Sequence, residues 1–224
     1  MTGVQTCALP ICIAPSRLEE SNTRRINDLL RSGETEALRK GTLIHAWLQQ
    51  IRWLESPLPA ENTLREIAAE HGSSESELTA ALQQFQSMLA TPLLRDLLSE
   101  ARYRQNELAT HASWLSPARP DHDWRLEVKN ERAFSVMREG GMLAGSVDRL
   151  ILVYDGERLV AADILDYKTD ALPANDPAEL QCAVERYRPQ QMAYREAIAA
   201  IYQLPSPRIR TRLAFLAPGQ LVTV

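Results

Sequence analysis

The residues best suited to chemistry lie at the ends of two neighbouring segments that read as β-strands. Within the first segment Asp148 ends the motif Gly145-Ser146-Val147-Asp148, and Asp166-Tyr167-Lys168 ends the second segment. Because side chains alternate along a strand, Asp166 and Lys168 share one face. The turn signal Asp155-Gly156 between the segments predicts an antiparallel hairpin. That hairpin brings Asp148 to within about 5 Å of Asp166, on the neighbouring strand.

Two carboxylates at this spacing repel each other unless a hard cation such as Mg²⁺ lies between them. Such a cation polarises a phosphoryl oxygen and lowers the pKa of bound water, while Lys168 can orient that water or offset developing charge. The pattern therefore indicates phosphodiester hydrolysis. The competing interpretation is an ordinary surface hairpin in which Asp166 and Lys168 form a solvated ion pair worth under about 1 kcal/mol.

Two further groups could join this chemistry. Tyr187, Gln190 and Tyr194 are spaced so that they project from one stripe of a helix, where they could hydrogen-bond a phosphate or the polar groups of the strand. His45 lies at the edge of an apolar helical stripe and could reach a cleft as a metal ligand. For both groups the alternative is a structural role, as packed tyrosines or a buried histidine.

The elements that position these residues follow from hydrophobic periodicity. The sequence predicts a helix-rich region from Pro15 to about Gln105, in which the motif Gly41 to His45 opens a helix with an apolar stripe. That stripe comprises Ile44, Trp47, Leu48, Ile51 and Leu54. Strands are expected over 124–136, 142–154 and 159–168, a long helix over 177–202, and two closing strands over 208–216 and 221–224. This order predicts a mixed α/β (α+β) fold, with a central mixed sheet flanked by helices and a helical N-terminal lobe.

Composition bounds the remaining possibilities. The 224 residues carry a formal net charge of −4 and are 45% hydrophobic, as expected for a globular chain. Residues 1–11 resemble a translated sequencing adaptor, so we expect the lobe to span 12–112 and the core 113–224, without the native start. Three cysteines, of which Cys7 lies in the adaptor-like segment and Cys12 borders it, do not make a disulfide framework or a zinc or iron–sulfur site. We expect a cytoplasmic protein without a membrane span.

Five motifs in order resemble the RecB-like branch of the PD-(D/E)XK nuclease superfamily, which has a restriction-endonuclease-like core. They are Gly41-x-x-x-His45, Glu131, Gly145-x-x-Asp148-Arg149, Asp166-x-Lys168 and Tyr187-x-x-Gln190-x-x-x-Tyr194. The resemblance implies that His45, Asp148, Asp166 and the carbonyl of Tyr167 bind a catalytic Mg²⁺, with Mn²⁺ as a substitute. It implies that Lys168 assists the attacking water.

The same resemblance assigns the supporting residues. Gln190 and Tyr194, with Tyr187 on their stripe, would orient the DNA backbone and brace the site. Glu131 would be an accessory acidic residue, and Arg149 would form a structural ion pair beside Asp148. An iron–sulfur cluster found in part of the branch is not expected, because only Cys182 remains.

The lack of an iron–sulfur ligand set, the apparent loss of the native start and the closing segment 214–222 together resemble the C-terminal nuclease domain of AddA or RecB type helicase–nucleases. The resemblance implies an exonuclease-type DNA nuclease acting in double-strand-break repair and recombination, with single- or double-stranded DNA as substrate. Its partners would be an upstream helicase region of the same polypeptide and a subunit of an AddAB- or RecBCD-like complex. The alternatives are a stand-alone RecB-like nuclease and a catalytically inactive fold that binds DNA or acts as a scaffold.

Two other patterns allow competing interpretations. Residues 62–82 resemble a helix-turn-helix, but the second helix begins with Glu75-Ser76-Glu77 where a DNA reader needs basic or amide groups. We therefore expect these helices to pack over the core. Arg208, Arg210 and Arg212 alternate along one predicted strand, so they could follow DNA phosphates or protect a solvated edge strand by their charge.

Overall fold

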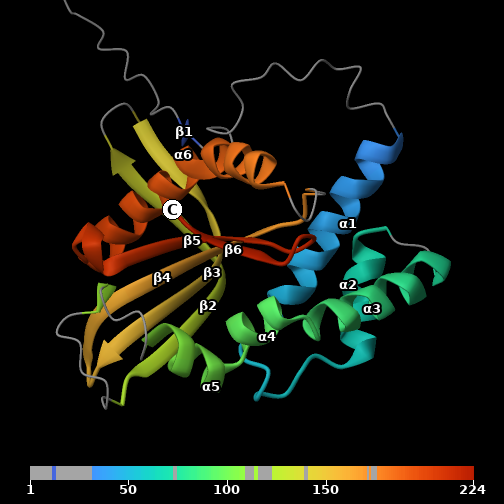
Figure 1. Cartoon of the computed structure of the whole chain (residues 1–224), viewed down its shortest axis with the longest axis horizontal. Coiled ribbons are helices and arrows are strands. Elements are labelled where there is room, and N and C mark those ends of the chain that lie inside the picture. Colours follow the sequence, from blue (N-terminus) through green and yellow to red (C-terminus); the bar gives the residue numbers. More distant parts are fainter. Residues whose placement is uncertain are drawn as a thin grey trace, which may run out of the picture.

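The computed structural model describes residues 12–13, 32–72, 75–108, 114–115, 123–138, 141–170, 172 and 176–224 (Figure 1). The adaptor-like residues 1–11 lie outside this range, as does most of the segment that separates the predicted lobe from the core. The helices are α1 (Ser32–Leu48), α2 (Glu61–Glu70), α3 (Glu75–Leu89), α4 (Pro92–Leu98), α5 (Glu100–Tyr103) and α6 (Pro177–Tyr202). The strands are β1 (Cys12–Ile13), β2 (Arg125–Arg138), β3 (Gly141–Asp155), β4 (Arg158–Lys168), β5 (Ile209–Phe215) and β6 (Gln220–Thr223). A π-helical turn, η2 (Arg104–Leu108), follows α5, and a 3₁₀ turn, η4 (Ser206–Arg208), precedes β5.

The strands form one mixed sheet in the order β2-β3-β4-β5-β6. β2, β3 and β4 are antiparallel neighbours, β5 is parallel to β4, and β6 returns antiparallel to β5. The short β1, which the sequence did not predict, pairs in parallel with the first residues of β3. The predicted strands and the long crossover helix are confirmed. The fold is the restriction-endonuclease-like α/β class expected from the sequence.

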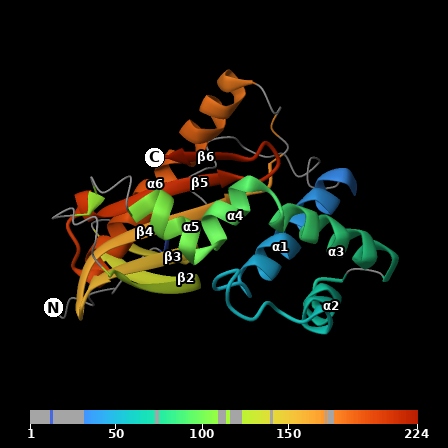
Figure 2. The ribbon, with the colours of Figure 1, turned by 60° about the horizontal axis from the view of Figure 1, so that its bottom comes forward.

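Helix α6 covers one face of the sheet. Side chains on alternate positions of β4, among them Ala162 and Ile164, pack with Ala197 and Ile198 of α6. The helix begins at an N-cap, Asp176, whose carboxylate accepts hydrogen bonds from the first backbone N–H groups. Figure 2 shows α6 and the shorter helices on different sides of the strands.

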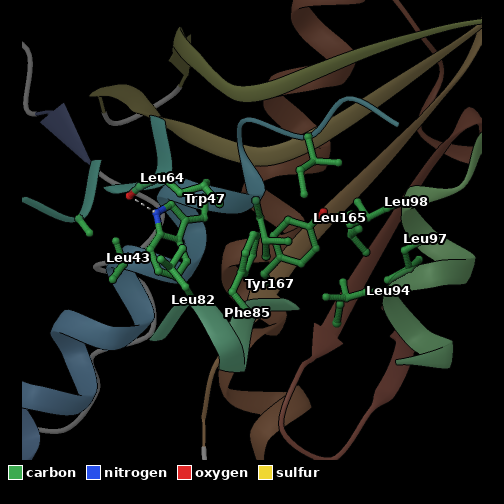
Figure 3. Close-up of a cluster of buried hydrophobic side chains, with 14 of the residues drawn as sticks. Leu43, Trp47, Leu64, Leu82, Phe85, Leu94, Leu97, Leu98, Leu165 and Tyr167 are labelled. Atoms are coloured by element: carbon green, nitrogen blue, oxygen red, sulfur yellow. Dashed lines mark hydrogen bonds between the residues drawn. The ribbon is translucent and has the colours of Figure 1, made fainter. Parts of the chain in front are cut away.

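The helical lobe of α1 to α4 packs on the other face through one buried cluster (Figure 3). Trp47 is almost fully buried there, and its indole N–H donates to the Leu64 carbonyl at 2.9 Å. Leu165 and Tyr167 of β4 complete the cluster from the sheet side. The helices α2 and α3, which resembled a helix-turn-helix, therefore pack over the core as expected.

Two expectations about local structure were wrong. Gly41 lies inside α1 and does not open it, and the helix ends at Leu48, before Ile51 and Leu54 of the predicted stripe. Both of these later residues still pack on the lobe cluster. The apolar periodicity therefore identifies buried residues correctly, although it extends beyond the end of the helix.

The alternating arginines do not form a charged edge. Arg208 lies in the turn before β5, and β5 is an interior strand between β4 and β6. Arg210 and Arg212 are buried, and both guanidinium groups donate to the carboxylates of Asp163 and Glu107. These two residues are therefore structural and cannot follow DNA phosphates, because their charges are neutralised inside the protein.

None of the described helices combines the length needed to cross a membrane with sufficient apolar character.

Candidate functional site

Three groups with metal-binding atoms converge from three elements. His45 lies on α1, Glu131 on β2 and Asp148 on β3, and their ligand atoms lie within 4.8 Å of one another. His45 Nδ1 is 3.3 Å from Asp148 Oδ2. Ligands that are each about 2.1 Å from one cation lie at most about 4.2 Å apart, so small side-chain movements would let these groups share an ion. An imidazole with two carboxylates is a donor set that fits a divalent cation.

The position of Asp148 follows from the end of a strand pairing. The hydrogen-bonded ladder between β3 and β4 stops at the pair Arg149 and Leu165, whereas β4 continues along β5 as far as Lys168. Beyond that point Asp148 Oδ2 accepts a hydrogen bond of 2.8 Å from the backbone N–H of Tyr167. The acid is thus fixed beside the Asp-x-Lys segment, where two strands separate.

Glu131 interrupts β2 directly across from Asp148. It lies between the ladder pairs Asn130–Arg149 and Arg132–Val147, with a left-handed φ of 45°. A non-glycine residue in that region of φ costs on the order of 1 kcal/mol or more, so surrounding interactions must hold Glu131 in this conformation. One such interaction is the hydrogen bond of 3.0 Å that the Ser146 hydroxyl donates to Glu131 Oε2.

Lys168 is held by groups from both β4 and α6. Its Nζ lies 2.8 Å from Asp166 Oδ2, donates to Gln190 Oε1 at 2.9 Å, and lies 3.7 Å from the centre of the Tyr187 ring. The Asp166 and Lys168 side chains are only 3% and 11% exposed, so theirs is not the solvated surface pair of the competing interpretation.

The helix residues of this group support one another. Gln190 Nε2 donates to the Tyr194 hydroxyl at 3.1 Å, and the Tyr187 hydroxyl donates to Asp170 Oδ2 at 2.8 Å. Gln190, Tyr194 and Tyr187 are each less than a tenth exposed. Their polar atoms therefore reach Lys168 and the end of β4 and are not presented to solvent. Asp170 was not identified from the sequence, although it is the next residue of the Asp166-Lys168 alternation.

The electrostatics of the site favour a bound cation. Burial, followed by the nearby charge of Asp148, raises the pKa of Asp166 to about 7, although Lys168 lowers it. Burial and Asp148 likewise raise the pKa of Glu131. Burial lowers the pKa of His45, but the hydrogen bond and charge of Asp148 outweigh it and raise the pKa overall. Carboxylates that resist ionisation because of one another are stabilised by an added positive charge.

Gly41 allows α1 to approach the end of β4. A Cβ atom at this position would lie 2.8 Å from Thr169 Oγ1, closer than van der Waals contact permits. Thr169 directly follows Lys168, and His45 lies one turn further along α1. The glycine of the predicted Gly41-x-x-x-His45 motif is thus a packing requirement for the helix that carries the histidine.

Arg149 has a structural role, but its described partners are neutral oxygens and not those of the expected ion pair. The guanidinium donates to the carbonyl oxygens of Ile51 and Arg52 and to the side-chain oxygen of Asn130. No local pattern indicates these carbonyl partners, because they lie far away along the chain.

The sequence model of a protein family described as the PD-(D/E)XK nuclease superfamily matches residues 21–221. A search of curated proteins found no match.

Proposed function

Because the chain belongs to the PD-(D/E)XK nuclease superfamily, we propose that it is a metal-dependent DNA nuclease whose active site joins His45, Asp148, Asp166 and Lys168. The observation that carries the proposal is the convergence of a histidine and two carboxylates beside the buried Asp166–Lys168 pair. A packed core would gain nothing from raised carboxylate pKa values, whereas a cation-binding site requires this excess of negative charge.

The residues that would hold Mg²⁺ or Mn²⁺ are His45, Asp148 and Asp166, with the carbonyl of Tyr167 between the last acid and Lys168. Glu131 belongs to the same cluster and would contribute a further carboxylate. When bound, a divalent cation polarises the phosphate that is to be cleaved and makes nearby water more acidic.

The chain itself supplies the remaining steps. Lys168 keeps its ammonium within reach of Asp166 and orients the attacking water, while Gln190 and the Tyr187 ring limit its freedom. As negative charge develops on the phosphoryl oxygens, the ammonium stabilises it at short range. Gln190, Tyr194 and Tyr187 act in this proposal by bracing the lysine, which their burial favours over contact with the DNA backbone.

The proposal has a direct test. Labelled single- and double-stranded DNA is incubated with the protein in Mg²⁺, in Mn²⁺ and in chelator, beside the variants Asp166→Ala and Lys168→Ala. We expect cleavage that needs the cation and is lost in both variants. Cleavage that persists in chelator or in both variants would refute the active site described above. If the parent protein does not cleave DNA at all, the result would favour an inactive DNA-binding fold.

A narrower role is proposed on sequence grounds. The resemblance of residues 214–222 to AddA- and RecB-type nuclease domains supports a part in DNA-break repair, with a helicase region on the same polypeptide and an AddAB- or RecBCD-like partner. In the fold these residues form the end of β5, the turn that follows it and most of β6. Reading the gene upstream of this sequence tests the idea, because helicase motifs should appear in the same frame; their absence would favour a stand-alone nuclease.

A further inference from the structure

Two side chains of the sheet hold the C-terminal end of α1. Asn130 Nδ2 donates to the carbonyl oxygens of Gln49 at 2.7 Å and Ile51 at 3.0 Å. Arg149 donates from Nη1 to Ile51 at 2.9 Å and from Nη2 to Arg52 at 2.5 Å. These carbonyls follow the last residue of α1, where no further helical turn is present to supply N–H partners. The sheet therefore supplies hydrogen-bond donors to the segment that directly follows α1.

Asn130 and Arg149 form a single unit, which we call the α1 clamp. They are direct partners in the β2–β3 ladder, and Arg149 Nη1 also donates to Asn130 Oδ1 at 3.2 Å. Asn130 thus donates through its nitrogen to α1 and accepts through its oxygen from Arg149. Each side chain fixes the orientation of the other.

Stability alone would not favour the clamp, because the clamp requires a buried charge. Arg149 has no measurable solvent exposure, and its guanidinium is hydrogen-bonded by neutral oxygens, with the Trp53 ring centre 4.8 Å away. Burying a charge carries a large desolvation cost, and well-packed apolar side chains often serve stability equally well. The carbonyl end of a helix does attract a cation, which explains why the arrangement is tolerated.

The position of the clamp shows what it can control. Asn130 immediately precedes Glu131, and Arg149 immediately follows Asp148. On the helix side, the first clamped residue, Gln49, donates its backbone N–H to the His45 carbonyl at 3.0 Å. The clamp therefore joins the three elements of the candidate metal cluster, one residue from each acid and one turn from the histidine.

We propose that Asn130 and Arg149 are positioning residues that hold His45 against Asp148 and Glu131, and so set the affinity of the site for a divalent cation. The inference rests on the proposed function. The clamp touches neither the cation nor the substrate; it acts through the placement of α1.

The test uses Mn²⁺ binding, measured by calorimetry on the whole chain without DNA, with hydrogen exchange of the backbone amides after Leu48 as a second readout. Arg149→Met keeps the side-chain length and removes the donors. Arg195→Met is the matched control, since Arg195 also donates to a hydroxyl oxygen and a backbone oxygen, those of Thr211 and Val224, but lies outside the candidate metal cluster. Asn130→Ala is a milder variant that leaves the buried charge in place and carries the test if Arg149→Met does not fold.

Removing an outer residue that orients a metal ligand typically weakens metal binding by about 10- to 100-fold. We expect a loss of that size for Arg149→Met and a smaller loss for Asn130→Ala, with faster exchange after Leu48 in both. Arg195→Met should keep the parent affinity. In a His45→Ala background, Arg149→Met should add little further loss, because it acts through the histidine.

Three results would overturn this proposal. They are an unchanged Mn²⁺ affinity in Arg149→Met and Asn130→Ala, an equal loss of affinity in Arg195→Met, and a full additional loss in the His45→Ala background. Failure of the proposed function differs from these. A parent protein that binds Mn²⁺ with the expected clamp effects but does not cleave DNA would refute the nuclease alone. A parent protein that binds no Mn²⁺ would refute both.

Discussion

His45 Nδ1 lies 3.3 Å from Asp148 Oδ2, and this contact joins the helical lobe to the point at which β3 and β4 separate. The first prediction concerns the protons on these groups. A cation needs a neutral histidine and an ionised Asp166, but the pKa of His45 is raised and that of Asp166 is about 7. Mn²⁺ binding should therefore strengthen by about tenfold between pH 6 and pH 8 and release protons.

Calorimetry in two buffers of different ionisation enthalpy measures both the affinity and the protons released. Asp166→Asn removes one titrating group and should reduce the pH dependence. An affinity that is constant from pH 6 to pH 8 would contradict this description of the site.

The second prediction concerns stability without a cation. Asp166, Glu131 and His45 all have pKa values above their ordinary ones, so the folded state holds protons that the unfolded chain has released. The free energy of unfolding contributed by these groups is therefore present at low pH and is lost as pH rises through their raised pKa values, which is about 7 for Asp166. In chelator, the melting temperature should fall between pH 5 and pH 8.

Mg²⁺ should restore that melting temperature at pH 8 and have less effect at pH 5, because the cation replaces the missing protons. Differential scanning fluorimetry across this pH range checks both statements. A melting temperature that rises from pH 5 to pH 8 in chelator would oppose the prediction.

The third prediction concerns Gly41. At an unhindered helix position, glycine to alanine stabilises a protein by about 1 kcal/mol. Gly41→Ala should not gain this stability, because the new Cβ would lie 2.8 Å from Thr169 Oγ1, and it should slow DNA cleavage by displacing α1. In a Thr169→Ala background the obstruction is absent, so the same change should become stabilising. Urea unfolding of the four proteins decides the matter: equal gains in both backgrounds would show that the close approach has no consequence.

The fourth prediction concerns the buried charge cluster around Asp163 of β4. Asp163 is fully buried and accepts hydrogen bonds from Arg210, Arg212 and the Tyr103 hydroxyl. Removing one partner of such a group leaves charges uncompensated, so Asp163→Asn should lower the free energy of unfolding by about 3–5 kcal/mol. Glu157→Gln, at an exposed turn position, is the control and should change it by less than about 0.5 kcal/mol. A similarly small loss for Asp163→Asn in urea unfolding would mean that the cluster is not needed.

The strands and α6 were predictable because their signals are local. Alternating apolar residues and the Asp155-Gly156 turn define β3 and β4, and the order of motifs places Asp148 beside the Asp166 segment. The histidine and both aspartates were identified in this way. Glu131 was identified only as accessory, because its position opposite Asp148 depends on the β2–β3 register.

The errors involve partners that are far away along the chain. The apolar stripe after Leu48 resembled more helix, but the carbonyls at that point are bonded by Asn130 and Arg149. Arg210 and Arg212 resembled a solvent-facing pattern, because the sequence around them does not show that Asp163 and Glu107 lie opposite. A periodicity identifies a buried face, but it does not show which distant group neutralises a charge.

The most direct test of the active site is the rate of Mg²⁺-dependent DNA cleavage by Lys168→Met, compared with the parent protein and with Lys129→Met. Lys129 is a matched lysine of β2 that pairs with Glu127, outside the candidate site. A lysine that stabilises the transition state is worth about 100-fold or more in rate. We predict a loss of at least this size in Lys168→Met, with folding retained, and an unchanged rate in Lys129→Met. Equal rates in all three proteins would contradict the assignment of Lys168, and with it the active site.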